Sequence, residues 1–148
     1  MKKTVAVLVL ATGMGVMPAL AHEPGTYESP IVEERVKRFK QSGGDIQAIF
    51  KKHLGAGNYA AIEAAAARMA IWGDDMPAAF PAGSNSVGAD AAIWQDFADF
   101  EAKAARFASA ARTLKTAAAS GNAGATKKAA QAVGASCKSC HQSYRIKH

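Results

Sequence analysis

The sequence predicts an all-α protein, an antiparallel four-helix bundle with its most informative motif on the C-terminal helix. Alanine is abundant and β-branched residues are sparse, which favours helix along most of the chain. In four segments the apolar residues recur at alternating spacings of three and four, as they do along the seam of a bundle. Strand-like alternation and long internal repeats are both lacking in the sequence.

The first 21 residues have the features of a secretory signal peptide. Lys2 and Lys3 precede an uncharged apolar run over residues 5–16, and small residues end the segment at Ala21. The run is too short and too weakly flanked to be a stable membrane anchor, which is the alternative. We expect cleavage after Ala21, export to the periplasm and one mature domain over residues 22–148.

The charge is mildly basic. The formal net charge is +6, and loss of the two lysines of the signal segment would leave about +4. This excess favours an encounter with an acidic redox partner. Nucleic acid is not indicated, because the basic residues are scattered and the chain is expected to be exported.

The first helix is predicted to begin at Ser29-Pro30, an N-cap followed by proline in the first turn. Gly55 and Gly57 should end it. Glycine in its middle costs helix propensity but leaves room for a bulky group on the inner face. That face is predicted to carry Val32, Val36, Phe39, Gly43, Ile46, Phe50 and His53.

The second helix should run from Asn58 to about Gly73, and a crossover rich in proline and glycine follows over residues 74–89. Met76 and Phe80 are its candidate inward anchors. The inner face of this helix should carry Tyr59, Ile62, Ala66 and Met69.

The third helix has Asp90 as its candidate N-cap and Gly121 as its stop, and the fourth should span residues 125–146. The inner face of the third helix is predicted to carry Ile93, Phe97, Phe100, Ala104, Phe107, Ala111, Leu114 and Ala118. That of the fourth is predicted to carry Ala130, Val133, Cys137, Cys140 and Tyr144.

Cys137-Lys138-Ser139-Cys140-His141 is the motif that carries chemistry. On a helix, the two thiols and the imidazole project from one side. Two thiols at this spacing can form thioethers with the two vinyl groups of one haem, and the adjacent imidazole can reach its iron. The motif therefore predicts one covalently attached haem c with His141 as the axial iron ligand.

Three competing roles for the cysteine pair are less well supported by the sequence. A thioredoxin-like redox pair needs a βαβ setting, which the helical pattern lacks. A zinc site needs four ligands, and only the scattered His22, His53 and His148 could add to the motif. A disulfide would close a very small loop and contribute little stability.

The mature chain resembles the class II c-type cytochromes, the cytochrome c-prime family. The family is a four-helix bundle with its haem motif near the C-terminus. Here that motif continues to Tyr144-Arg145, an aromatic then a basic residue, as in the family. The segment Ile93-Trp94-Gln95-Asp96-Phe97 and the spacing of Arg35, Phe39, Lys40 and Gly43 also look like the family's.

The resemblance gives Phe39 a specific role. In low-spin relatives this position holds a methionine that binds the iron, whereas phenylalanine has no donor atom. The resemblance thus implies five-coordinate, high-spin iron with an apolar open face that binds nitric oxide or carbon monoxide, or transfers electrons. Phe39 as an ordinary core residue remains the alternative.

Two arginines complete the predicted haem environment. Arg35 lies one turn before Phe39 and could pair with a haem propionate, or be a solvated surface residue. Arg145 lies one turn after His141 and could tune the iron, or simply complement the helix dipole. Trp72 and Trp94 are expected mainly to pack.

The sequence also allows other functions. A low-spin electron carrier with Met69 or Met76 as sixth ligand is the alternative, and His53 is a weaker candidate ligand. An enzyme such as a peroxidase would want a distal acid–base residue, and none is evident near Phe39, so we expect no catalytic residue. The resemblance implies a homodimer formed through the first two helices.

Overall fold

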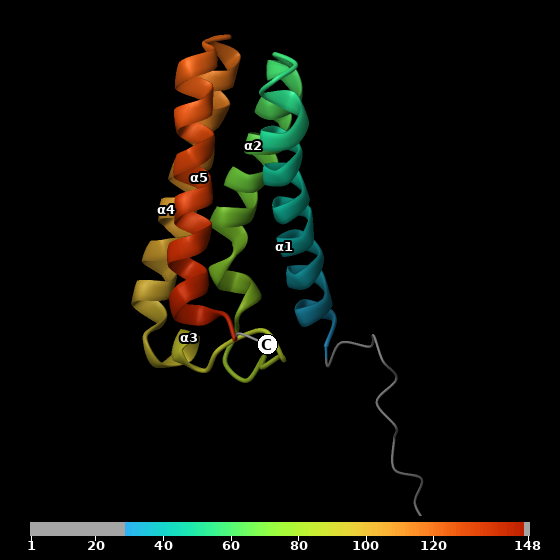
Figure 1. The fold of residues 1–148 in the computed structure, drawn as a ribbon. Coiled ribbons are helices and arrows are strands. Elements are labelled where there is room, and N and C mark those ends of the chain that lie inside the picture. The colour runs from blue at the N-terminus through green and yellow to red at the C-terminus, as the bar shows by residue number, and fades with distance from the viewer. Residues whose placement is uncertain (1–28, 147–148) are drawn as a thin grey trace, which may run out of the picture.

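The computed structural model describes residues 29–146, which form four long helices joined by short helical pieces and loops (Figure 1). The predicted signal peptide lies outside the described residues. The long helices are α1, Pro30–Ala48, α2, Tyr59–Asp75, α4, Phe97–Ala119, and α5, Ala123–Tyr144. The short ones are the π-helix η1, Ile49–His53, the 3-10 helix η2, Pro77–Ala79, and α3, Ala92–Gln95. The predicted all-α four-helix bundle is confirmed.

Polar side chains fix where the helices begin. The Ser29 hydroxyl accepts a hydrogen bond from the Val32 amide, and the Asn58 and Asn122 side chains cap α2 and α5 in the same way. Gly57 and Gly121 have φ values of 62° and 67°, a left-handed conformation that glycine adopts without steric cost. The predicted start of the first two helices and the turn at Gly121 are thus confirmed.

The core lies mainly along α4, which packs against α2 on one side and α5 on the other, whereas α1 makes fewer contacts (Figure 1). Ile62, Met69, Leu114 and Val133 are each at most 1% exposed. Burial of such side chains stabilises a fold by roughly 1.5–3 kcal/mol each. Because α1 stands off from α4 and α5, a cavity remains between them.

Gly73 is predicted to end the second helix, but α2 continues through it to Asp75. Gly73 is instead a point of close helix contact. A Cβ atom placed on it would lie 2.7 Å from the Ala108 Cβ and 2.8 Å from the Ala108 amide nitrogen of α4. The missing side chain therefore permits the approach of α2 to α4.

The third segment is broken where one helix is predicted. The Asp90 carboxylate accepts from the Ala92 amide at 2.9 Å, but only the short α3 follows. Asp96 then leaves helical conformation, and its side chain accepts from the Asp99 amide at 3.2 Å to cap α4. A second capping aspartate thus ends one helix and begins another.

The inner face of the first helix also shifts near its end. Phe50 is predicted to lie inside but is 44% exposed, while Ile49 is fully buried. The chain there forms the wider π turn of η1, in which the Leu54 amide bonds to the Ile49 carbonyl. An extra residue in the turn rotates the following side chains away from the α-helical register.

The crossover is tied to residues 145–146, which follow α5. Met76 and Phe80 are each 4% exposed, so their prediction as inward anchors is confirmed. Ala89 forms an antiparallel bridge with Arg145, and the Ile146 amide donates to the Gly88 carbonyl at 3.3 Å. Within residues 29–146, no helix has the length and apolarity that a bilayer crossing needs.

Candidate functional site

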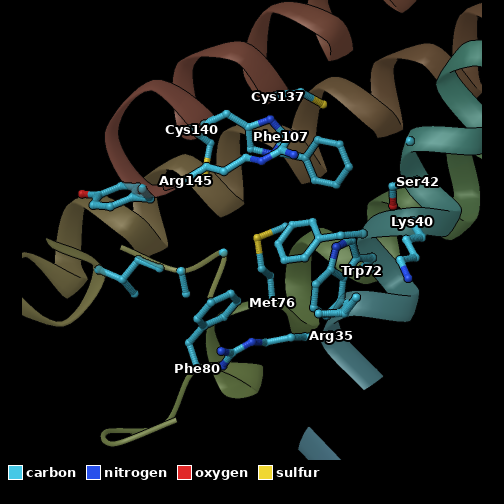
Figure 2. A pocket seen from close by; sticks show the side chains of 18 of the residues that line it. Arg35, Lys40, Ser42, Trp72, Met76, Phe80, Phe107, Cys137, Cys140 and Arg145 are labelled. Carbon is cyan, nitrogen blue, oxygen red and sulfur yellow. The ribbon is translucent and has the colours of Figure 1, made fainter. Parts of the chain in front are cut away.

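A cavity of about 700 Å³ opens between α1, the crossover, α4 and α5. It is lined by all six residues that the sequence singles out: Arg35, Phe39, Cys137, Cys140, His141 and Arg145. Figure 2 shows the cysteines of α5 on one wall and Arg35 and Trp72 on the opposite side. Residues distant in sequence therefore meet around one space.

The cysteine pair lies on the cavity face of α5. Cys137 and Cys140 are free thiols, each partly buried. Burial raises the pKa of both, and the nearby Cys137 helps to raise the pKa of Cys140 to about 11. The raised pKa values favour the protonated thiols over the thiolates, and the structure has no disulfide between the two residues.

His141 occupies the next position on the same wall. Partial burial, with a smaller effect of the positive Arg145, lowers the pKa of its imidazole. A lowered pKa favours the neutral ring at neutral pH, and the neutral ring is the form that binds metal ions. Among residues 29–146, no three histidine, cysteine or acidic side chains form a metal-binding cluster.

An aromatic cluster forms the wall that faces α5. The Phe39 ring meets Trp72 edge to face at 5.1 Å between centroids, and Phe80 at 6.2 Å. Phe80 in turn packs against Phe100 at 4.8 Å. These contacts hold the Phe39 ring at the cavity wall, so Phe39 is both a packing residue and a cavity residue.

Arg35 is buried and only 2% exposed. The sequence leaves open whether it pairs with a haem propionate or lies at the surface. Its guanidinium donates to the Ser84 hydroxyl at 2.8 Å and the Ser84 carbonyl at 2.5 Å. It also donates to the Ala79 carbonyl and the Ser86 hydroxyl. With its Cζ atom 4.2 Å from the Phe80 ring centroid, it anchors the crossover beside the cavity. It is therefore not a solvated surface residue.

The two tryptophans, both expected to pack, differ in their polar contacts. Trp94 donates its indole N–H to the carbonyls of Phe80 and Pro81, at 3.1 Å each. Trp72 lines the cavity at 3% exposure, and its buried Nε1 has no hydrogen-bond acceptor among the described residues.

Of the three residues considered as a sixth iron ligand, only Met76 lines the cavity. Met76 lines the cavity, and Figure 2 shows its sulfur directed into the space. Met69 is buried in the core at 1% exposure, and neither it nor His53 is among the residues lining the cavity. Met76 is thus the methionine in position to meet a group bound in the cavity.

A network near the end of α5 escaped the sequence analysis. The Tyr144 hydroxyl donates to the Asp99 carboxylate at 2.7 Å, and Lys103 forms an ion pair with the same carboxylate. The bond from Lys103, followed by that from Tyr144, lowers the pKa of Asp99. Burial and the bond to Asp99 raise the pKa of Tyr144. Only the i, i+4 spacing of Asp99 and Lys103 is visible in the sequence.

The cavity fits a covalently attached haem. Two thiols one turn apart and an imidazole share one wall, while the facing wall is aromatic. A Cβ on Gly43, which lines the cavity on α1, would meet nothing within 4 Å, so the space is open there.

Comparison with known proteins assigns the family. The model of the family described as Cytochrome C' matches residues 10–145. Cytochrome c-556 of Agrobacterium tumefaciens strain II Chrys is 37% identical over 119 residues, covering 78% of this chain and 97% of the relative. Cytochrome c' of Rhodospirillum rubrum is 32% identical over 151 residues and covers 98% and 99%.

A solved structure has the same fold. It is the nitric oxide complex of a point mutant of cytochrome c prime from Alcaligenes xylosoxidans, with a TM-score of 0.70 and 27% identity. The match covers 82% of this chain and all of that chain. The family model spans nearly the whole chain, and two thiols and an imidazole of this chain lie on one cavity wall. This protein therefore belongs to the cytochrome c' family and carries one covalently bound haem c.

Proposed function

We propose that this chain is an exported, periplasmic cytochrome that binds small diatomic gases such as nitric oxide and carbon monoxide at an open haem face. In this proposal Cys137 and Cys140 hold the haem and His141 is the only protein ligand of the iron. Phe39 covers the other face. The observation that carries the proposal is that α5 contributes the three attachment residues to a cavity whose α1 wall presents Phe39.

The thiols fit their proposed role. Cys137 and Cys140 would hold the haem through two thioether bonds, one to each vinyl group, and a thiol adding to a vinyl group needs no oxidant. The haem then supplies an iron centre that binds ligands and exchanges electrons. The chain's own part is to orient the haem from α5 and to shield its other face with the aromatic wall.

The aromatic side chains that face α5 across the cavity support gas binding rather than an enzymatic reaction. Phe39 and Phe80 offer no acid–base group, and proton transfer in catalysis requires one close to the reacting atoms. An apolar wall disfavours water and admits small neutral ligands. The solved neighbour in complex with nitric oxide is in keeping with this proposal.

Absorption spectra of the purified oxidised and reduced protein test the proposal, before and after addition of carbon monoxide. A broad high-spin spectrum that shifts strongly with carbon monoxide is expected. A sharp low-spin spectrum that carbon monoxide does not alter would contradict an open iron site.

Met76 supports one second candidate, a low-spin electron carrier. Its sulfur reaches the cavity, and thioethers bind haem iron in electron-transfer cytochromes. Met76→Leu separates the two proposals. The variant should keep the wild-type spectrum if the iron is open, and should change from low spin to high spin if Met76 is a ligand.

We also propose the partners that the sequence suggests, an acidic redox protein and a second copy of this chain. Phe50 and Ile71 are 44% and 58% exposed on the first two long helical segments. Apolar side chains of this size at a surface are compatible with a homodimer. Sedimentation of the haem-loaded protein should give twice the monomer mass, and a monomer at all concentrations would contradict the dimer.

A further inference from the structure

We propose that the ion pair between Asp99 and Lys103, held in place by Tyr144, tunes the reduction potential of the haem attached through Cys140. The positive charge of Lys103 opposes oxidation of the haem, and the negative charge of Asp99 favours it. This inference rests on the proposed attachment at Cys140 but not on gas binding, because the two charges act on the haem whether its other face is open or closed.

Tyr144 brings the ion pair to the helix that carries the attachment residues. Its hydroxyl donates to the Asp99 carboxylate at 2.7 Å, which ties the end of α5 to the start of α4. Lys103 is paired with the same carboxylate, and its Nζ atom lies 5.5 Å from the centroid of the Tyr144 ring. Tyr144 lines the cavity one turn after Cys140. The ion pair is therefore held against a side chain of the cavity wall, beside the attachment site.

Both charges act on the position of Cys140. Burial and the nearby Cys137 dominate the raised pKa of this thiol, but Lys103 also lowers the pKa and Asp99 also raises it. A charge formed at Cys140 is thus felt by both groups, with opposite signs. A haem joined to this residue changes its charge when it gains or loses an electron, so the same two groups act on that change.

The ion pair is only partly exposed to solvent. The Lys103 side chain is 14% exposed and that of Asp99 is 38% exposed. Lys37 and Glu33 of α1 form a pair with the same i, i+4 spacing, but their side chains are 64% and 47% exposed. Water and salt screen a charge less when it is withdrawn from solvent. Removal of one partner at α4 should therefore leave the other charge acting on the haem.

An i, i+4 ion pair near the start of a helix also has an ordinary structural role, since it stabilises the helix. The two roles differ in the sign of what is lost. Removal of either partner lowers helix stability, whereas the reduction potential should move in opposite directions for Asp99 and Lys103. The sign of the change thus distinguishes tuning from a structural role.

The test is the reduction potential of the haem-loaded protein, measured by spectroelectrochemical titration. Lys103→Met removes a positive charge and should lower the potential, because less positive charge opposes the oxidised haem. Asp99→Asn removes a negative charge and should raise the potential. The variant with both changes should return close to the wild-type value, since the two losses compensate each other.

The exposed pair on α1 provides the matched controls. Lys37→Met and Glu33→Gln remove the same charges from residues that are not among those lining the cavity, so they should shift the potential much less. Far-ultraviolet circular dichroism checks that each variant keeps its helices. Shifts of one sign for Lys103→Met and Asp99→Asn would overturn the inference, because a disturbed fold would then move the potential. Equally large shifts from the α1 pair would also overturn it, because net charge alone would suffice.

Tyr144→Phe tests the part of the tyrosine. The variant keeps a ring in the cavity wall but loses the hydroxyl that holds the Asp99 carboxylate. Asp99→Asn should shift the potential less in this background than in the wild-type protein, because the carboxylate is no longer fixed beside α5. An equal shift in both backgrounds would overturn the role of Tyr144.

The outcomes separate this inference from the proposed function. If denaturation releases the haem from the chain, the proposed attachment is wrong and the inference fails with it. If the haem stays attached and carbon monoxide binds, but neither Lys103→Met nor Asp99→Asn moves the potential, gas binding stands and the tuning role alone is overturned.

Discussion

Phe39 packs in an aromatic cluster and also lines the cavity, so a packing role and the proposed role at the haem meet in one side chain. Its ring is held by Trp72 and Phe80, which explains an apolar residue there without any ligand. The same ring lines the cavity that also holds Cys137, Cys140 and His141, the residues proposed to hold the haem. What distinguishes the two roles is the chemistry of a replacement, because a core position tolerates any apolar side chain of similar volume.

Replacing Phe39 with methionine tests its distal position. The thioether sulfur should bind the iron, turn the spectrum from high spin to low spin and suppress carbon monoxide binding. Phe39→Leu is the control, since leucine has no donor atom and should keep the high-spin spectrum. A well-folded methionine variant with an unchanged spectrum would remove residue 39 from the iron site.

Asp99 links stability to pH. Its pKa in the folded protein is lowered by Lys103 and Tyr144, so its contribution is present above the unfolded value of about 4. That contribution is lost as the pH falls through the lower folded value. Asp99→Asn should therefore lower the melting temperature at pH 7, and the gap to wild type should shrink below pH 4. A gap that stayed constant down to pH 2 would contradict this linkage.

The elements are held together by a few close contacts. The α2–α4 contact depends on the absence of a side chain at Gly73, and the crossover depends on the buried guanidinium of Arg35. Neither feature follows from helix propensity. Each is a tertiary contact that sets how one element lies against another.

Gly73→Ala should lower the free energy of unfolding by about 1–3 kcal/mol, because the new methyl group forces α2 away from Ala108. Gly44→Ala is the matched control. A Cβ at Gly44 meets nothing within 4 Å inside α1, so alanine should raise stability by roughly 0.5–1 kcal/mol. Urea denaturation measures both, and equal effects would argue against the tight contact.

Arg35→Met should release the crossover and lower the free energy of unfolding by roughly 2–3 kcal/mol, since buried carbonyl and hydroxyl groups lose a charged donor. Arg38→Met, at an exposed arginine with ion pairs to Glu34 and Asp75, should cost about 0–1 kcal/mol. Urea denaturation gives the two energies. Limited proteolysis near Ser84 should be faster in the Arg35 variant alone.

At the scale of the whole molecule, the helices and the cysteine–histidine motif could be predicted because they depend on local patterns, whereas Arg35 and Phe39 were singled out through the family resemblance. Periodic apolar residues place a helix face, and the spacing of Cys137, Cys140 and His141 is itself a helical geometry. The π turn of η1 and the break at Asp96 could not be predicted, because tertiary packing overrides the local periodicity there.

The polar details of the site escaped prediction for the same reason. Arg35 and Ser84 are 49 positions apart, and Tyr144 and Asp99 are 45 apart. No sequence window holds both partners of either bond. The unpaired N–H of Trp72 is harder still, since it is defined by the partner it lacks.

The pairing of Ile146 with Gly88 has a practical consequence for anyone who produces this protein. Both residues line the cavity, so any segment attached directly after Ile146 starts at the cavity. A polyhistidine purification tag attached there would therefore begin beside the proposed open iron. If the iron is open as proposed, imidazoles of the tag would bind it and turn a high-spin spectrum into a low-spin one, so the spectra should be recorded on tag-free protein.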